Sequence, residues 1–208
     1  MNRGRFITLE GGEGAGKTTA AEVVERWLQE QGRHVIRTRE PGGTPAAEKV
    51  RALLLDPATG ELEPMTELLM MFAARAENLA RIIRPALAAG QDVLCDRFSD
   101  ASRAYQGGGR RLGIQVVNRL AGLVHPDLQP DLTLLLDVPV AVGMARVAER
   151  GGDTDRFEQA RSDFLERVRA AYLTQASLEP ERIVVIDAGQ SLDRVRDRIT
   201  AVLSERLG

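Results

Sequence analysis

Residues 11–19, which read GGEGAGKTT, constrain this chain more than any other segment. They match the pattern G-x-x-x-x-G-K-[ST] and stand between an apolar strand, expected at 6–9, and a helical pattern that begins at Thr18. In such a loop, glycines let backbone N–H groups turn toward phosphates, the lysine adds a mobile positive charge, and the following hydroxyl can reach Mg²⁺. This order of elements predicts a binding site for a purine nucleoside triphosphate.

The whole loop is expected to contact ATP, through Gly11, Gly12, Glu13, Gly14, Ala15, Gly16, Lys17, Thr18 and Thr19. Lys17 would act catalytically on the β- and γ-phosphates, and Thr18 would be a ligand of Mg²⁺. Glu13 is unusual, because a carboxylate among phosphate-binding amides repels the nucleotide unless it faces a cation or another group. We expect it to reach a Mg²⁺-bound water or a sugar hydroxyl.

Short apolar runs alternate with longer helical patterns along the rest of the chain. Strands are expected at 6–9, 34–38, 92–95, 132–136 and 183–186. Helices are expected at 18–31, 46–55, 66–89 with a break at Pro85, 114–124, 140–149, 155–178 and 192–207. This alternation, without a linker or repeat, predicts a single domain over 1–208. Its fold class is α/β: a P-loop NTPase fold, with a five-stranded parallel sheet and helices on both faces.

Composition narrows the class of protein. With 28 Lys+Arg against 30 Asp+Glu, a net charge of −2 argues against a nucleic acid polymer as partner. The apolar stretches near Asp137 are too short for a membrane helix, no secretory segment follows Met1, and Cys95 is the only cysteine, so we expect a cytoplasmic protein that binds no membrane. Lys17 and Lys49 are the only lysines, and neither stands in an N-K-x-D guanine-reading box. The remaining class is a compact kinase acting on a small acceptor.

Such a kinase needs extra positive charge for a second phosphate. Asp96 and Arg97 directly follow the strand expected at 92–95, at the sheet edge where the phosphate loop also lies. Asp96 could orient a Mg²⁺-bound water or Lys17, and we predict it as a metal-site residue. The forked guanidinium of Arg97 could bridge the donor and acceptor phosphates, which makes it a candidate catalytic residue.

Several segments resemble the bacterial thymidylate kinase family. They are TREPGGT at 38–44, DRF at 96–98, YQGGGR at 105–110, and PDLT at 130–133 together with Asp137. The resemblance runs from the first strand to the last helix. It implies transfer of the γ-phosphoryl group of ATP to dTMP, giving dTDP, with Mg²⁺ as cofactor, and it implies a homodimer.

The resemblance also implies how the thymine base would be held. Arg75 would read the base, while Ser102 and Gln106, four residues apart, would hydrogen-bond its N3/O4 edge. The family usually stacks thymine on a Phe four residues before this arginine. Here that position is Met71, and Phe72 lies three before, so either could stack on the base.

The same resemblance implies contacts to the sugar and phosphate of dTMP. Tyr105 would crowd the sugar 2′ position and disfavour ribonucleotides. Arg51 is favoured for the acceptor phosphate, and Arg39 is the other candidate unless it pairs with Glu40. With Glu13 and Arg97, these residues complete the expected dTMP site.

Residues 146–158 combine glycines with clustered arginines, as expected of a mobile lid over ATP. The family places a catalytic arginine either in the phosphate loop or in this lid. Because the loop here has none, the lid must supply it, and Arg150 and Arg156 are the candidates. Glu158 is expected to reach Mg²⁺ or its waters.

The expected mechanism is in-line attack by a dTMP phosphate oxygen on the γ-phosphorus. The acceptor is already anionic, so no general base is required, and catalysis reduces to alignment and charge neutralisation. Two rival functions remain open at this point: another nucleoside monophosphate kinase, such as a guanylate or uridylate kinase, and a non-catalytic ATP-binding sensor.

Overall fold

The structure, a computed structural model, describes residues 3–151, 155–158 and 161–208. Its parallel five-stranded sheet has the order β2-β3-β1-β4-β5. The strands are β1 (Phe6–Gly11), β2 (Val35–Arg39), β3 (Asp92–Asp96), β4 (Leu132–Asp137) and β5 (Ile183–Asp187). All five expected strands are confirmed. Every residue of β1 is buried, as is typical of a strand covered on both faces.

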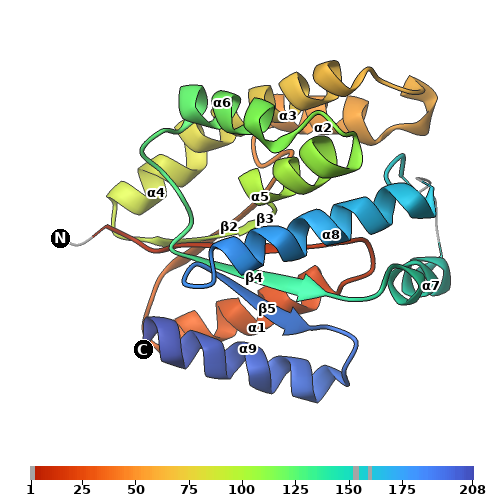
Figure 1. The fold of residues 1–208 in the computed structure, drawn as a ribbon. Helices are drawn as coiled ribbons and strands as arrows, with labels where there is room; N and C mark the ends of the chain where they lie inside the picture. Colours follow the sequence, from red (N-terminus) through yellow and green to blue (C-terminus); the bar gives the residue numbers. More distant parts are fainter. Residues whose placement is uncertain (1–2, 152–154, 159–160) are drawn as a thin grey trace.

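Helices cover both faces of this sheet (Figure 1). On one face lie α1 (Lys17–Glu30) and α9 (Leu192–Leu207), whose apolar sides pack on β1 and β4. On the other lie α4 (Arg84–Ala88), α5 (Ser99–Ser102) and α8 (Ser162–Leu178). Beyond them α2 (Pro45–Leu55), α3 (Pro64–Asn78) and α6 (Ile114–Val124) form an outer layer. Helix α7 (Val140–Arg150) follows β4. The expected fold is confirmed.

The helix expected at 66–89 does not break at Pro85, so that detail of the prediction is wrong. A π-helical segment, Leu79–Ile83, joins α3 to α4, and Pro85 lies near the start of α4. A proline ring clashes with the carbonyl four residues earlier in a regular α-helix. The wider π-helical turn just before Pro85 leaves room for the ring, so the helix continues through it.

The helix expected at 155–178 is also wrong at its start, since α8 begins at Ser162. The Asp155 carboxylate accepts hydrogen bonds from the backbone N–H groups of Phe157 (2.8 Å) and Glu158 (2.9 Å). Such local bonds favour a turn over a helix. Residues 152–154 of the expected lid lie outside the described residues.

The segment after β3 is more helical than its sequence indicates. Helix α5 continues directly into a second π-helical segment, Arg103–Gly109. This segment packs against α8 and carries Tyr105 and Gln106 at the same edge of the sheet as the phosphate loop. Within the described ranges, no helix is long and apolar enough to cross a membrane.

Candidate active site

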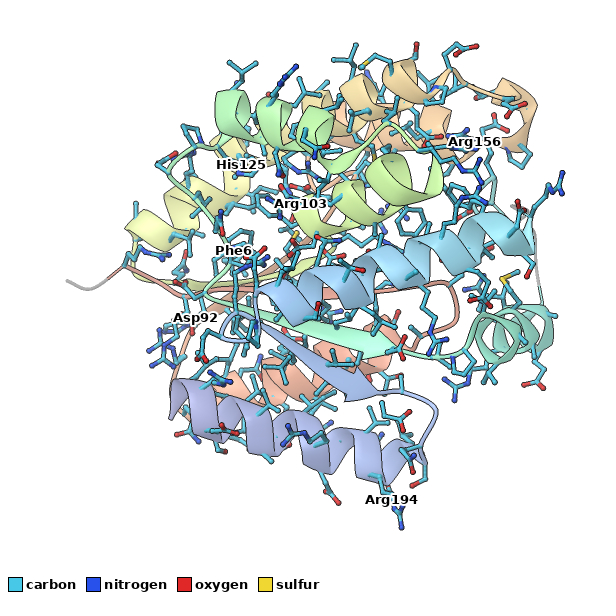
Figure 2. All side chains as sticks on the ribbon, in the orientation of Figure 1. Phe6, Asp92, Arg103, His125, Arg156 and Arg194 are labelled. Atoms are coloured by element: carbon cyan, nitrogen blue, oxygen red, sulfur yellow. The ribbon has the colours of Figure 1, made fainter. Side chains whose placement is uncertain are left out.

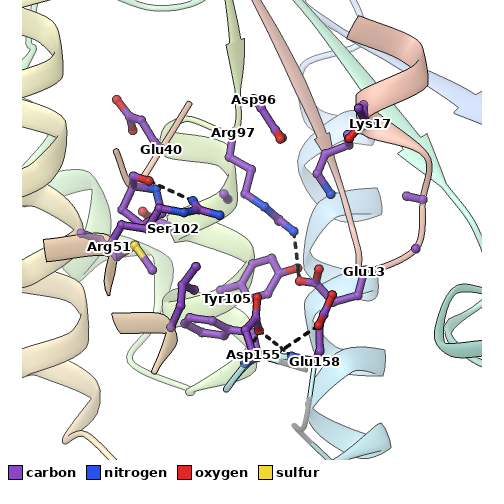
Figure 3. A pocket seen from close by; sticks show the side chains of 18 of the residues that line it. Glu13, Lys17, Glu40, Arg51, Asp96, Arg97, Ser102, Tyr105, Asp155 and Glu158 are labelled. Carbon is purple, nitrogen blue, oxygen red and sulfur yellow. Dashed lines mark hydrogen bonds and ion pairs between the residues drawn. The ribbon is translucent and has the colours of Figure 1, made fainter. Parts of the chain in front are cut away.

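A cavity of about 610 Å³ opens at the carboxyl ends of β1, β2 and β3 (Figure 3). Most of the expected site residues line it: Glu13, Gly14, Ala15, Gly16, Lys17, Thr18, Arg51, Met71, Arg75, Asp96, Arg97, Ser102, Tyr105, Gln106, Arg150 and Glu158. Five expected residues do not line it: Gly11, Gly12, Thr19, Phe72 and Arg156. The parallel sheet therefore brings segments far apart in the sequence to one edge.

The phosphate loop turns into α1 at Gly16, whose backbone is left-handed with φ 85°. Lys17 follows, and its ammonium group donates to the carbonyl oxygens of Gly12 (3.1 Å) and Gly11 (3.3 Å). Burial and the nearby Arg97 guanidinium lower the pKa of Lys17, and the neighbouring carboxylates only partly oppose them. An anion beside Lys17 would relieve this excess of positive charge.

Arg97 adopts a left-handed backbone conformation with φ 70°, which is uncommon for a residue other than glycine. Its backbone N–H donates to the carbonyl of Leu9, which ties the turn to the end of β1. Its guanidinium donates to Glu13 Oε1 (3.0 Å) and to the Tyr172 hydroxyl (3.3 Å). This strained turn holds the guanidinium over the cavity.

Glu13 bends away from the phosphate loop toward Arg97. Its Oε1 also accepts a hydrogen bond from the Tyr105 hydroxyl (2.6 Å). Burial raises the pKa of Glu13, but the charges of Arg97 and Lys17 outweigh this effect, so the net pKa is lowered. Glu13 is therefore an anion held within a set of cationic groups, and it can accept hydrogen bonds from a ligand hydroxyl.

Asp96 lines the cavity together with Lys17 and with Arg51 of α2 (Figure 3). The Oδ1 atom of Asp96 is buried and has no hydrogen-bond partner among the described residues. Arg51 donates to the carbonyl of Pro41 (2.9 Å). Burial and the charge of Arg39 lower the pKa of Arg51. The cavity thus contains a carboxylate oxygen to which no described residue donates, and an incompletely neutralised guanidinium.

The suggestion that Arg39 pairs with Glu40 is wrong. Arg39 instead pairs with Glu48 (2.9 Å), one turn into α2. Glu40 turns into the protein and pairs with Arg75 (2.6 Å). Successive residues of an extended chain point to opposite sides, so the side chains of these two neighbours cannot share one surface.

Arg75 is only 2% exposed and reaches the inner end of the cavity from α3. Besides its bond to Glu40, it donates through Nη2 to the Phe98 carbonyl and to Ser102 Oγ, both at 3.0 Å. Nη1 is buried and has no partner within the described ranges. A buried donor left unpaired costs about 1–3 kcal/mol, which indicates that a ligand acceptor completes the set.

Met71 and Phe72, the two candidates for stacking on the base, point in different directions. Met71 lines the cavity. Phe72 is 3% exposed and packs with Leu68 of its own helix and Val117 of α6. The Arg75 guanidinium lies over the Phe72 ring, 4.4 Å from its centre, so Phe72 supports the arginine from behind.

The two candidate arginines of the lid also differ. Arg150 lines the cavity, and its side chain is 60% exposed and pairs with Glu158 (2.6 Å). Arg156 is half-buried and does not line the cavity; it pairs with Glu67 (2.7 Å) and donates to the Leu54 carbonyl (2.9 Å). Glu158 also accepts from the backbone N–H of Asp155, so both its oxygens are engaged and nothing in this geometry supports its expected metal role.

Sequence reasoning missed several residues that shape the site. Glu10 accepts from the Phe98 backbone N–H and the Tyr172 hydroxyl, both at 2.7 Å, and burial raises its pKa to about 8. Glu40 and Glu67 hold Arg75 and Gln106 in place. Arg146 of α7 lines the cavity and donates to the Ala188 carbonyl (3.0 Å). The sequence could have indicated Glu10, because a charged residue inside an otherwise apolar strand is unusual. The other three residues give no such signal, because their partners are far away in the sequence.

Comparisons with known proteins agree with this geometry. A sequence model described as thymidylate kinase matches residues 9–199. The thymidylate kinase of Chromohalobacter salexigens is 57% identical over 208 residues, which cover 100% of this chain and 98% of that one. That of Ectopseudomonas mendocina is 55% identical, with 98% and 97% covered. A crystal structure of thymidylate kinase from Ehrlichia chaffeensis superimposes with a TM-score of 0.78 at 34% identity, covering 97% of this chain and 99% of that one. The chain belongs to the thymidylate kinase family.

Proposed function

We propose that this protein transfers the γ-phosphoryl group of ATP to dTMP, giving dTDP, with Mg²⁺ as cofactor. One observation carries the proposal. A single cavity is lined by a phosphate loop and also by Gln106 and Arg75, whose buried Nη1 donor has no partner among the described residues. A phosphoryl donor and a base-bearing acceptor can therefore meet within it.

The polar groups at the inner end fit the edge of thymine. Thymine presents O4, an acceptor, next to N3–H, a donor. Arg75 Nη1, which has no partner in the described part of the chain, offers a donor for O4, and the amide oxygen of Gln106 offers an acceptor for N3–H. Met71 lies on the cavity wall and supplies an apolar contact for the base.

The groups near the sugar favour a deoxyribonucleotide. The Tyr105 ring stands against the cavity, 5% exposed, and its hydroxyl is fixed by its bond to Glu13. A fixed aromatic ring leaves no space for an added 2′-hydroxyl. The Glu13 carboxylate is available to accept from the 3′-hydroxyl, so it contributes to the acceptor site more than to ATP binding.

Transfer then follows from alignment and charge. Lys17 would contact the β- and γ-phosphates of ATP, and Arg51 the phosphate of dTMP. Arg97, between them, would bridge donor and acceptor. The lowered pKa values of Lys17 and Arg51 are consistent with sites that await anions. A dTMP oxygen attacks the γ-phosphorus in line, and no side chain needs to take a proton.

The residues present fit a Mg²⁺ ion. Mg²⁺ is usually held by one or two carboxylates together with phosphates and waters. Asp96 has a buried oxygen with no partner among the described residues, and Thr18 offers a hydroxyl on the same cavity wall. These two would hold the ion or its waters. When bound, the ion would neutralise charge on the β- and γ-phosphates.

Of the two lid candidates, Arg150 is better suited as the catalytic arginine. It lines the cavity on an exposed, flexible side chain whose partner, Glu158, also lies there. Arg156 is committed to Glu67 and to the carbonyl of Leu54. A guanidinium that reaches the phosphates only when the lid closes would limit wasteful hydrolysis of ATP.

We also propose that the protein forms a homodimer. Large apolar side chains are exposed on the outer layer: Leu53 on α2, Met65 and Leu69 on α3, and Ile114 and Leu123 on α6. These helices lie together in Figure 1. A second copy covering them would remove this apolar surface from water. We expect sedimentation equilibrium to give twice the mass of one chain, and a monomer at micromolar concentration would contradict dimerisation.

A coupled assay of the purified protein with MgATP tests the function. dTMP should be phosphorylated with a kcat/KM far above those of GMP, UMP and dCMP. A preference for another monophosphate would show that the protein is a different nucleoside monophosphate kinase. ATP binding without transfer to any monophosphate would support the hypothesis of a non-catalytic ATP-binding sensor. A cytoplasmic location stays a prediction from the sequence.

A further inference from the structure

Glu67, in the first turn of α3, is completely buried and lies outside the cavity described above. Four hydrogen bonds reach its carboxylate. Gln106 Nε2 (2.9 Å) and Arg110 Nε (3.2 Å) donate to Oε1, while Arg110 Nη2 (3.0 Å) and Arg156 Nη2 (2.7 Å) donate to Oε2. One carboxylate thus joins α3, the π-helical segment at 103–109, and the turn at 155–158.

The chemistry of this cluster fixes the orientation of the Gln106 amide. A carboxylate paired with two guanidinium groups can only accept hydrogen bonds. The amide must therefore turn its NH₂ group toward Glu67, which leaves Oε1 as the acceptor on the opposite side. Gln106 is 1% exposed and lines the cavity, so this oxygen is the atom offered to a ligand there.

The fixed orientation has a consequence for the choice of base. At the position where thymine and uracil carry an N3–H donor, cytosine carries an acceptor nitrogen, and where they carry O4 it carries an amino donor. Gln106 Oε1 would then face an acceptor, and Arg75 Nη1 would face a donor. Buried groups left unpaired in this way weaken binding, because each has lost its bonds to water without gaining a partner.

We propose that Glu67 is a specificity-determining positioning residue, which excludes cytosine nucleotides by locking the amide of Gln106 in the orientation that reads N3–H. Arg110 and Arg156 have a supporting role, because they keep the buried carboxylate in place. This inference rests on the proposed function. Thymine and uracil present the same edge to Gln106, so the discrimination expected from Glu67 is against cytosine.

The test is Glu67→Gln, a change of similar size. The new amide must direct its NH₂ toward one side of the cluster. On the Oε2 side it would oppose two guanidinium donors, Arg110 Nη2 and Arg156 Nη2. On the Oε1 side it would oppose only Arg110 Nε, whose bond is the longest of the four (3.2 Å), and Gln106 can turn its oxygen to accept from it. We therefore expect the amide of Gln106 to rotate and present NH₂ to the cavity.

The measurement is kcat/KM for dTMP and for dCMP, with ATP saturating. The ratio of these two values should fall at least 10-fold in Glu67→Gln, mainly through a higher KM for dTMP, while KM for ATP changes less than 2-fold. This ratio does not depend on the fraction of enzyme that is folded, because that fraction scales both kcat/KM values equally. A merely structural role for Glu67 would lower both values equally.

The matched control is Asp92→Asn. Asp92 is also completely buried and paired with an arginine, Arg33, but it lies at the amino end of β3, away from Arg156 and the cavity (Figure 2). The Asp92→Asn variant should be less stable than the unaltered enzyme. Its ratio of kcat/KM for dTMP to kcat/KM for dCMP should be the same as that of the unaltered enzyme. If Asp92→Asn lowers this ratio as Glu67→Gln does, the specific role of Glu67 is excluded.

A double-mutant cycle tests whether Glu67 acts through Gln106. In a Gln106→Leu background there is no amide to orient, so adding Glu67→Gln should leave the ratio within 2-fold of that of Gln106→Leu alone. Additive effects would overturn the proposal, and so would an unchanged ratio in the single Glu67→Gln variant. Failure of the unaltered enzyme to phosphorylate dTMP would instead reject the proposed function, so the two failures are distinguishable.

Discussion

Gly14 of the phosphate loop and Gly143 of α7 meet backbone to backbone. A Cβ atom on Gly14 would lie 2.0 Å from the carbonyl oxygen of Gly143, and one on Gly143 would lie 2.3 Å from the carbonyl oxygen of Glu13. No side chain fits between them. Helix α7 leads into the segment that we expect to act as a lid, so this contact fixes the position of α7 relative to the phosphate loop.

We predict that Gly143→Ala raises KM for ATP at least 10-fold, because the new methyl group must push the phosphate loop or α7 away. The helical conformation of Gly143 itself tolerates alanine, so the effect reports only the close approach. Steady-state kinetics with varied ATP measure it. The control is Gly122→Ala in α6, where a Cβ meets nothing within 4 Å; its KM for ATP should be unchanged.

Arg97→Ala should lower kcat much more than it weakens ATP binding. Its guanidinium lines the cavity and is paired with Glu13 of the phosphate loop, where we propose that it bridges donor and acceptor and stabilises the charge of the transferring group. Loss of one such donor typically costs about 10²–10³ in kcat. Turnover and equilibrium binding of an ATP analogue should be measured together, with the exposed Arg84→Ala as control. Equal losses in kcat and affinity would argue against the bridging role.

Met71→Ala should weaken dTMP binding, whereas Phe72→Ala should lower the stability of the fold. Met71 lines the cavity, so its truncation should raise KM for dTMP several-fold and leave the thermal midpoint nearly unchanged. Phe72 is buried against α6, so its truncation should cost about 3–5 kcal/mol of folding free energy. Thermal unfolding and dTMP kinetics of both variants distinguish the roles. A normal KM in Met71→Ala would remove Met71 from the base site.

Arg150→Ala should lower kcat by roughly 100-fold or more with little loss of stability, because its exposed side chain can move to the phosphates. Arg156→Ala should lower stability by about 1.5–3 kcal/mol, since it removes one of the two guanidinium partners of the buried Glu67 carboxylate and leaves Arg110 in place. Arg161→Ala, on a largely exposed side chain next to the lid, should change neither quantity. If Arg156→Ala is stable and inactive while Arg150→Ala is active, our assignment of the two arginines is wrong.

His125 should make the fold sensitive to mild acid. Burial, reinforced by the charge of Arg75, lowers its pKa from 6.5 to about 4. The unfolded chain therefore binds a proton before the folded chain does. The stability contributed by the neutral ring is complete above pH 6.5 and is lost as the pH falls toward 4.

Urea unfolding midpoints measured between pH 7 and pH 4 test this expectation, with His125→Gln as the comparison. The amide can replace the bonds of the ring with Ser99 Oγ (2.8 Å) and the Leu128 carbonyl (3.0 Å) but does not titrate. The variant should be less stable at pH 7 and should lose less stability on acidification. Parallel pH curves for the two proteins would mean that His125 does not contribute.

The sequence by itself determined the strands, the phosphate loop and the Asp96-Arg97 step. Each depends on neighbours in the chain: burial on both faces makes a strand continuously apolar, and a phosphate loop needs its glycines and lysine at fixed spacing. The order of strand, loop and helix then predicts a parallel sheet, whose carboxyl edge gathers the functional residues.

Only the tertiary structure decided which neighbouring residue faces the cavity and which charged groups pair. Met71 and Phe72 differ by about 100° around one helix, and the packing of α3 on α6 selects which of them faces the cavity. Arg75 and Glu40 are 35 residues apart, and Glu67 and Arg156 are 89 apart. Such pairs form because a buried charge requires a partner, but the fold brings the partners together, and no local pattern in the sequence records which they are.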